Sequence, residues 1–237
     1  MWVKRRCRQN GGIDSCPDFF NNPLVRLFLI LFAALLGSCA ALPERPHVAN
    51  PQAAWQTRQA SLAHVNAWDI RGRLALRTAD EGFQASLQWV READRHRIDL
   101  TGPLGGGHVR LTQDKNGAEL RDANDKLYRN SSVQQLLART TGWDVPFEGL
   151  IYWVLGLPAP EAAGKSELDE WGRLKILEQR GWEIRFLEYA QHDAYEFPSR
   201  VYIKRKSEVA SDTTLEVRIV IEKWTQSNTS TQGLALN

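Results

Sequence analysis

Alternation of apolar and polar residues is the feature that most restricts the fold of this chain. In segments 70–76, 83–89 and 98–100, apolar residues or glycine occupy every second position, and the residues between them are polar or charged except Ala75. Such alternation is typical of β-strands with one buried face. Turn residues at 114–117 and 122–125 separate neighbouring segments. We therefore expect consecutive strands to pair as an antiparallel meander.

The same period returns in the C-terminal part of the chain. Strands are expected at 174–179, 182–189, 200–206 and 215–224, with a tight turn at 179–181. The last strand has one clear apolar face, formed by Leu215, Val217, Ile219 and Ile221. Two groups of strands thus lie on either side of a central region with a different pattern.

Helical spacing of apolar residues is found in three segments. A helix at 51–68 would bury Trp55 and Leu62 and leave Arg58 in solvent. A second helix is expected at 131–141, with Ser131 or Ser132 as its N-cap, and a third at 146–155. The third is apolar on nearly every side, so it should be buried or line a cavity. The predicted fold is mostly β with α: a single curved antiparallel sheet that forms an incomplete β-barrel, covered by about three helices.

The N-terminal segment has the pattern of a secretory signal. Basic residues precede an apolar run at 27–36, and Gly37, Ser38 and Cys39 follow it. The run is about half of the roughly 20 residues that span a bilayer. The sequence around Cys39 is similar to a bacterial lipobox, which implies N-acyl and S-diacylglycerol groups on Cys39 at the start of the mature protein. The alternatives are an uncleaved membrane anchor or a plain signal peptide. Val25 is a second candidate for the translation start.

The net charge and cysteine count of the chain without its signal segment restrict the classes of function that it can have. Five of the 30 basic and two of the 28 acidic residues lie before Cys39, so the net charge of the remainder is close to −1. This balance argues against a nucleic-acid partner. Cys7 and Cys16 leave with the signal, so no disulfide is expected. The predicted organisation is a signal peptide (1–38), a lipidated N-terminus and proline-containing tether (39–53), one lipid-binding domain (54–225) and a disordered tail (226–237).

Catalytic and metal-binding patterns are weak in this sequence. It has no His-Glu-x-x-His metal motif and no Gly-x-Ser-x-Gly nucleophile elbow, and its glycine run at 105–107 is not a phosphate loop. Asp169 and Glu170 are expected to be solvated in a polar loop. Asp193 and Glu196 form an unconvincing hydrolase pair. We therefore expect no catalytic residues, no metal, no cofactor beyond the covalent lipid, and no enzymatic activity.

Several short motifs, taken in order, resemble one known family. These are the lipobox, the helix with Trp55, and the segments 98–105, 122–128 and 155–158, followed by Trp224. Each motif alone is common, but the ordered set on a lipoprotein is similar to the outer-membrane lipoprotein receptors of the LolB family. The resemblance implies a half-open barrel with a helical lid and an apolar cavity, similar to that of the periplasmic carrier LolA.

The resemblance also implies a function and a location. Proteins of this family accept lipoproteins from LolA and insert them into the outer membrane, so the expected partners are LolA, lipoprotein acyl chains and outer-membrane phospholipid. We expect a monomer on the periplasmic face of the outer membrane, and Ala40 is similar to the outer-membrane-directed class. The alternatives are a structural or assembly accessory lipoprotein with a filled core, and a periplasmic-face hydrolase.

Two sets of site residues follow from this interpretation. Leu104 matches an exposed leucine that aids membrane insertion in the family, although a tip that folds back onto the sheet is the alternative. The glycines after Leu104 should make its loop flexible. We expect Arg71, Arg73 and Arg77 to lie on a solvated strand face. The alternative is that they contact an acidic rim of the carrier protein. Ordinary hydrophobic core is the favoured interpretation of any one apolar residue, and only the set as a whole indicates a cavity. The expected lipid-cavity residues are Leu87, Trp89, Ile98, Leu100, Val109, Leu111, Leu150, Trp153 and Val154.

Overall fold

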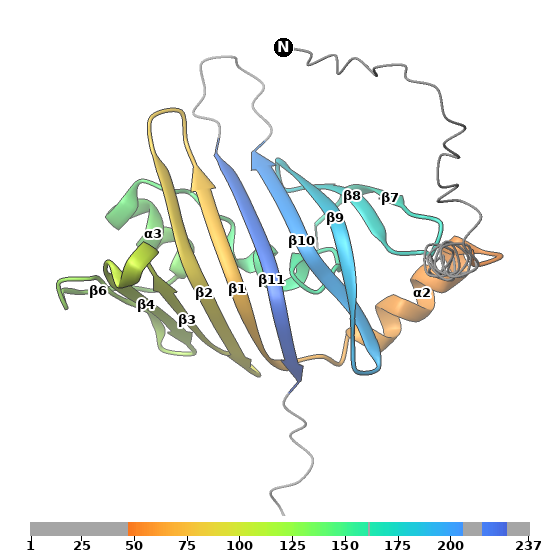
Figure 1. Ribbon diagram of the computed structural model, residues 1–237, viewed down its shortest axis with the longest axis horizontal. Helices are drawn as coiled ribbons and strands as arrows, with labels where there is room; N and C mark the ends of the chain where they lie inside the picture. The colour runs from red at the N-terminus through yellow and green to blue at the C-terminus, as the bar shows by residue number, and fades with distance from the viewer. Residues whose placement is uncertain (1–46, 161, 206–214, 227–237) are drawn as a thin grey trace, which may run out of the picture. The chain divides into compact units, whose positions relative to one another are not determined.

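The computed structural model describes residues 47–160, 162–205 and 215–226 (Figure 1). These residues contain eleven strands in one antiparallel sheet that does not close into a barrel. The strands are β1 (Ala67–Arg77), β2 (Gly82–Glu92), β3 (Arg95–Thr101), β4 (His108–Asp114), β5 (Gly117–Arg121), β6 (Leu127–Asn130), β7 (Gly164–Leu168), β8 (Leu174–Gln179), β9 (Trp182–His192), β10 (Tyr195–Arg205) and β11 (Glu216–Gln226). The predicted fold class is confirmed.

Pairing between the first and last strands joins two meanders into this sheet. The order is β6-β5-β4-β3-β2-β1-β11-β10-β9-β8-β7, so β1 and β11 lie at the centre. The β1–β11 register shifts between Arg71 and Gly72. A Cβ atom at Gly72 would lie 1.9 Å from the carbonyl oxygen of Val220. Glycine is therefore required at this register shift, because any side chain there would overlap the backbone of β11.

Three α-helices and one short 3-10 helix accompany the sheet in the described residues. They are α2 (Pro51–Leu62), α3 (Val133–Thr141), α4 (Phe147–Trp153) and η2 (Pro103–Gly105). Ser132 caps α3 and accepts a hydrogen bond from the backbone N–H of Gln135. The first predicted helix was too long. It ends at Leu62, and Trp68 belongs to β1, where pairing with β2 and β11 extends the backbone.

The prediction also missed one strand and placed the start of another too late. Strand β7 was missed because its residues are polar and show no alternation, which is compatible with an edge strand held by pairing to β8. Strand β10 begins at Tyr195 rather than near 200. It contains Pro198, and the β9–β10 register shifts directly after this residue. The proline is accommodated at this irregularity, because it has no backbone N–H to donate to the neighbouring strand.

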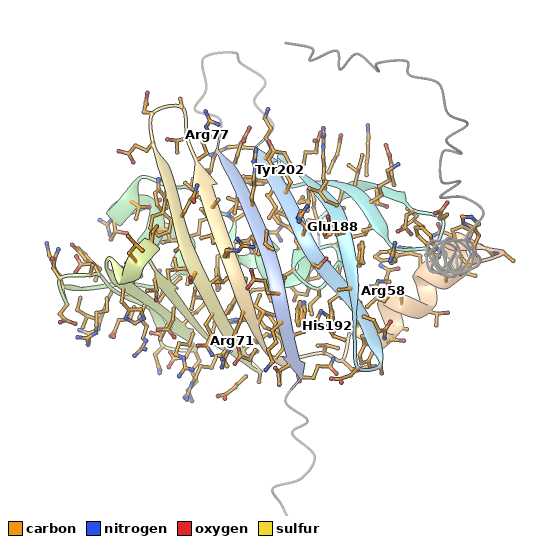
Figure 2. All side chains as sticks on the ribbon, viewed as in Figure 1. Arg58, Arg71, Arg77, Glu188, His192 and Tyr202 are labelled. Carbon is orange, nitrogen blue, oxygen red and sulfur yellow. The ribbon has the colours of Figure 1, made fainter. Side chains whose placement is uncertain are left out.

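The two faces of the sheet differ in what covers them. The inner face carries the buried residues of the strands between the two edge strands, for example Val217, Ile219 and Ile221 of β11. Figure 1 shows α3 at the end of the sheet that carries β4 and β6, and α2 beside β9 and β10. The outer face carries exposed polar residues, and Figure 2 shows Tyr202 standing on it. No described helix is both long enough and apolar enough to cross a membrane.

Candidate functional site

Leu104 occupies the tip of a compact loop between β3 and β4. The side chain is fully exposed. Three backbone hydrogen bonds close the loop: Gly102 N–H to the oxygen of Gly107 (3.0 Å), Gly105 to Gly102 (3.2 Å) and Gly106 to Pro103 (3.0 Å). The loop therefore presents one large apolar side chain to solvent on a hydrogen-bonded base. Insertion of Leu104 into a bilayer remains a prediction.

The backbone of Leu104 has a conformation that leucine seldom adopts. Its φ and ψ angles are 55° and 24°, in the left-handed region. A strained residue of this kind is kept only where its surroundings require it, and such residues gather at functional sites. A Cβ atom at Gly102 would lie 2.1 Å from the oxygen of Gly106. The glycine there is thus part of the geometry that places Leu104 at the tip.

The nine predicted cavity residues all belong to the interior between the sheet and its helices. Leu100 and Val109 are half-buried and pack against the core, and the other seven are buried within it. In the described structure they pack with other apolar side chains. Three surface hollows of about 360, 570 and 860 Å³ are lined by none of the nine. Their contact with lipid therefore remains a prediction that requires the interior to open.

A cluster of aromatic rings occupies the centre of this interior. Trp68 lies edge-on to Trp89 and Trp224, with ring centroids 5.1 and 5.6 Å apart, and Phe197 stacks on Trp224 at 4.2 Å. The indole N–H groups of Trp68 and Trp224 are buried and have no hydrogen-bond acceptor among the described residues. Unsatisfied buried donors of this kind are uncommon. A carbonyl group or water entering the interior would provide an acceptor.

The segment after α4 is fixed to β8 by one buried amide. The side-chain oxygen of Gln179 accepts hydrogen bonds from the Trp153 indole (3.1 Å) and the backbone N–H of Ala159 (2.9 Å). Its amide nitrogen donates to the backbone oxygens of Ala159 and Ala162, both at 2.9 Å. A fully satisfied buried amide specifies one arrangement of the chain around it. The C-terminal end of α4 is therefore anchored to the sheet.

His96 is the only histidine among the buried polar residues of the described chain. Its Nδ1 accepts a hydrogen bond from the indole N–H of Trp89 at 3.3 Å, and Phe147 of α4 contacts its ring. The pKa of His96 is lowered to about 4, mainly by burial and in smaller part by nearby Arg91, while Asp94 opposes the shift. His96 is therefore neutral at pH 7 and can act as the acceptor.

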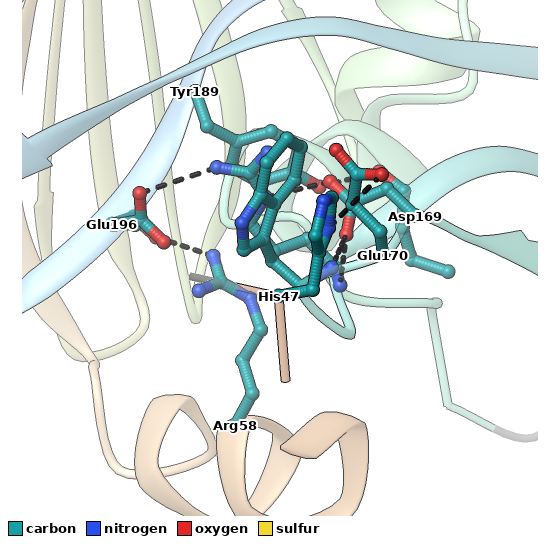
Figure 3. A network of polar contacts seen from close by, with 9 residues as sticks. His47, Arg58, Asp169, Glu170, Tyr189 and Glu196 are labelled. Atoms are coloured by element: carbon teal, nitrogen blue, oxygen red, sulfur yellow. Dashed lines mark hydrogen bonds and ion pairs between the residues drawn. The ribbon is translucent and has the colours of Figure 1, made fainter. Parts of the chain in front are cut away.

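A partly buried polar cluster, here called the arginine clamp, fixes α2 to the other end of the sheet (Figure 3). It consists of Arg58, Asp169, Arg173, Tyr189 and Glu196. Arg173 bridges Asp169 (2.7 Å) and Glu196 (3.2 Å), and its guanidinium lies 4.5 Å from the ring centroid of Tyr189. Arg58 reaches from α2 and donates to the backbone oxygen of Glu196. Burial lowers the pKa of Arg58 and raises that of Tyr189.

The clamp corrects two predictions. Arg58 was expected in solvent but lies in this partly buried cluster. Asp169 was expected to be solvated, yet its side chain is 16% exposed and is ion-paired with Arg173. Glu170 is more exposed and pairs with His47 at 3.2 Å. Residues far apart in sequence build the clamp, so no local pattern could have revealed it.

Leu187 is a site candidate that the sequence interpretation missed. It is the second large apolar side chain that the described residues expose, after Leu104. Trp182, Ile184 and Phe186 are buried on the inner face, so Leu187 projects from the outer face of β9. The alternation itself contains this signal, because Leu187 breaks it. Within the described residues, no group of three His, Cys, Asp or Glu side chains is arranged to hold a metal.

Comparison with known proteins places this architecture in a family. The profile described as "Outer membrane lipoprotein LolB" matches residues 66–224. The chain belongs to the LolB family. The match includes the Leu104 loop, all nine interior residues and the arginine clamp apart from Arg58. Cys39 lies outside the matched segment and outside the described residues.

Curated relatives extend the LolB similarity over most of the chain. Three proteins named outer-membrane lipoprotein LolB are 35% (Nitrosococcus oceani), 32% (Stutzerimonas stutzeri) and 34% (Pseudomonas putida) identical to it. The alignments cover 84%, 85% and 81% of this chain and 96%, 95% and 91% of the relatives. A solved LolA superfamily protein from Nitrosomonas europaea is 8% identical and covers 76% of this chain and 95% of its own, with a TM-score of 0.48. That similarity adds nothing to the family assignment.

Proposed function

We propose that this chain is a lipid-anchored receptor at the outer membrane that accepts lipoproteins and inserts them into that membrane. Its cargo would arrive on a periplasmic carrier of the LolA type, and the interior behind the sheet would hold the acyl chains. Cys39 would provide the anchor. Membership of the LolB family supports this role and location. The single structural observation that carries the delivery step is the fully exposed Leu104 on its closed loop.

The energy of acyl-chain transfer explains why a receptor of this kind needs no catalytic group. Removing each CH₂ group from water is worth roughly 0.8 kcal/mol, so cargo with several acyl chains cannot cross an aqueous space unprotected. It must move from one apolar environment to another. Since a factor of ten in affinity corresponds to about 1.4 kcal/mol, small differences between successive sites suffice to give direction.

The interior must open to admit acyl chains, and most of its contacts are of a kind that an acyl chain can replace. Leu150 and Phe147 of α4 and the strand residues Leu87 and Trp89 make apolar packing contacts, which are non-directional. An acyl chain can replace such contacts at small net cost. In contrast, Gln179 holds Trp153 at the end of α4 through one hydrogen bond and the segment after the helix, at Ala159 and Ala162, through three more. We therefore propose that the interior opens near the start of α4, on the side of α3, and not near the end of α4 that Gln179 holds.

Replacement of Leu104 by glutamate tests the delivery step. A Leu104→Glu variant should fold normally because the side chain has no packing contacts to lose. It should still accept labelled lipoprotein from the carrier, but transfer to liposomes should fall severalfold, because a carboxylate is costly to place among acyl chains. Reconstituted transfer from loaded carrier to liposomes is the measurement.

A Leu104→Phe variant is the matched control. It retains an apolar side chain at the tip and should deliver cargo at close to the original rate. Equal delivery by the glutamate and phenylalanine variants would contradict the role of Leu104. If the unaltered protein accepts no lipoprotein at all, the receptor function itself is wrong and an accessory lipoprotein with a filled core is favoured.

A further inference from the structure

The outer face of the sheet contains a hollow that the receptor role does not use. Its volume is about 860 Å³, and it extends over β1, β2, β9, β10 and β11. Four arginines line it and no carboxylate does. We call it the arginine hollow after these residues, which are Arg73, Arg185, Arg200 and Arg218.

Carboxylates pair with these arginines from outside the hollow. Arg73 pairs with Glu222 at 2.9 Å, Arg185 with Glu183 at 2.6 Å, Arg200 with Glu188 at 2.9 Å and Arg218 with Glu216 at 3.7 Å. All four arginine side chains are more than half exposed. A guanidinium has five N–H donors, and exposed ion pairs of this kind are weak. The arginines therefore retain donors for an anion that enters the hollow.

Apolar groups stand beside these charges. Leu187, Val220, Tyr202 and Pro103 line the same hollow. Because Pro103 precedes Leu104, the hollow that contains Leu187 reaches the base of the loop that exposes Leu104. Exposed apolar side chains next to cationic ones are typical of proteins that lie in the interface of an anionic bilayer.

We propose that the arginine hollow binds the phosphate groups of anionic phospholipids and lays the outer face of the sheet on the membrane surface. Arginine forms bidentate hydrogen bonds with phosphate, and four arginines around an apolar floor match a headgroup attached to acyl chains. Leu187 would enter the interface beside the hollow, and Leu104 would enter next to Pro103. The inference rests on the proposed function only in assuming that the protein works at a bilayer. The inference goes beyond that function because it names a second contact between the protein and the bilayer, and the class of lipid that this contact binds.

Environment-sensitive fluorescence at the hollow tests this proposal. Ser86 lines the hollow on the exposed side of β2, so a Ser86→Cys variant can carry the dye. The lipid-anchored protein is placed in nanodiscs of phosphatidylcholine alone or of phosphatidylcholine with phosphatidylglycerol, and mass spectrometry verifies a single attached dye. We expect emission at shorter wavelength with phosphatidylglycerol, and high salt should reduce the shift.

Charge reversal identifies the residues responsible. An Arg185→Glu/Arg200→Glu variant should lose the shift, and an Arg185→Gln/Arg200→Gln variant should lose part of it. The control is Arg129→Glu, because Arg129 is an exposed arginine on β6 that also pairs with a glutamate, at 3.0 Å, and it lies outside the hollow. This control should shift like the unaltered protein.

Three results would overturn the proposal: equal emission in both lipids, a shift that survives charge reversal, or a shift that appears only when the carrier protein is added. The last would assign the hollow to a protein partner. Cargo transfer into phosphatidylcholine liposomes is measured in parallel. A lipid-dependent shift without cargo transfer would contradict the receptor function but leave lipid binding by the hollow intact. Cargo transfer without the shift would contradict lipid binding by the hollow but leave the receptor function intact.

Discussion

The two ends of the inner face are held by different chemistry. At the α2 end, the arginine clamp joins helix, loop and strands through partly buried charges and directional hydrogen bonds. At the α4 end, Phe147 and Leu150 are buried among apolar side chains, and only Trp153, the last residue of the helix, is also held by a hydrogen bond, to Gln179. Buried charges are costly to separate, whereas apolar contacts can be exchanged for a hydrocarbon ligand. The comparison indicates that the α2 end is a fixed frame and the α4 end is the part that cargo can displace.

The largest expected effect comes from breaking the clamp. The side chain of Arg173 is 14% exposed and pairs with both Asp169 and Glu196. An Arg173→Ala variant would remove this shared cation and leave the two carboxylates partly buried. We expect the free energy of unfolding to fall by about 3–5 kcal/mol. Urea denaturation measures this loss. The control is Arg121→Ala, which removes an exposed pair at 3.8 Å and should change stability by less than about 0.5 kcal/mol.

A matched pair of leucine truncations tests whether only the α4 end accepts hydrocarbon. Leu150→Ala and Leu62→Ala both remove a buried side chain, the second from α2. Each should cost about 2–5 kcal/mol in unfolding free energy. Added decanoate should restore part of the loss for Leu150→Ala only, because its chain can fill that space. Equal restoration in both variants, or in neither, would remove the distinction between the two ends.

Acid should weaken the α4 end through His96. The unfolded histidine gains a proton near pH 6.5, whereas the buried ring has a pKa of about 4. Stability is therefore unaffected by this group above pH 6.5 and falls as the pH drops from 6.5 to 4, by at most about 3 kcal/mol. Protonation of Nδ1 would also remove the hydrogen bond from Trp89.

A His96→Phe variant isolates this contribution. The difference in unfolding free energy between the original protein and the variant, measured by urea denaturation at pH 7 and pH 4.5, cancels the other titrating groups. We expect the original protein to lose more stability than the variant over this interval. Parallel losses in both proteins would mean that His96 is not held neutral by its surroundings.

Local pattern was sufficient to predict much of this molecule. Most strands, the turns at 114–117 and 179–181 and the helices α3 and α4 lie close to where the alternation and the helical spacing placed them. These features depend on residues a few positions apart, whose side chains share a face by geometry alone. The ordered motifs also led to the LolB family, which the family match confirms.

Tertiary structure alone decided the rest. The β1–β11 pairing, the arginine clamp and the arginine hollow bring together residues more than a hundred positions apart, and the periodicity of one segment contains no information about its distant partner. Arg58 appeared to be a solvent residue because its helix has a polar face, but its partner Glu196 lies 138 residues away. The sequence determined which strand side chains alternate between the two faces of the sheet, whereas the order of the strands in the folded sheet determined which of these side chains meet.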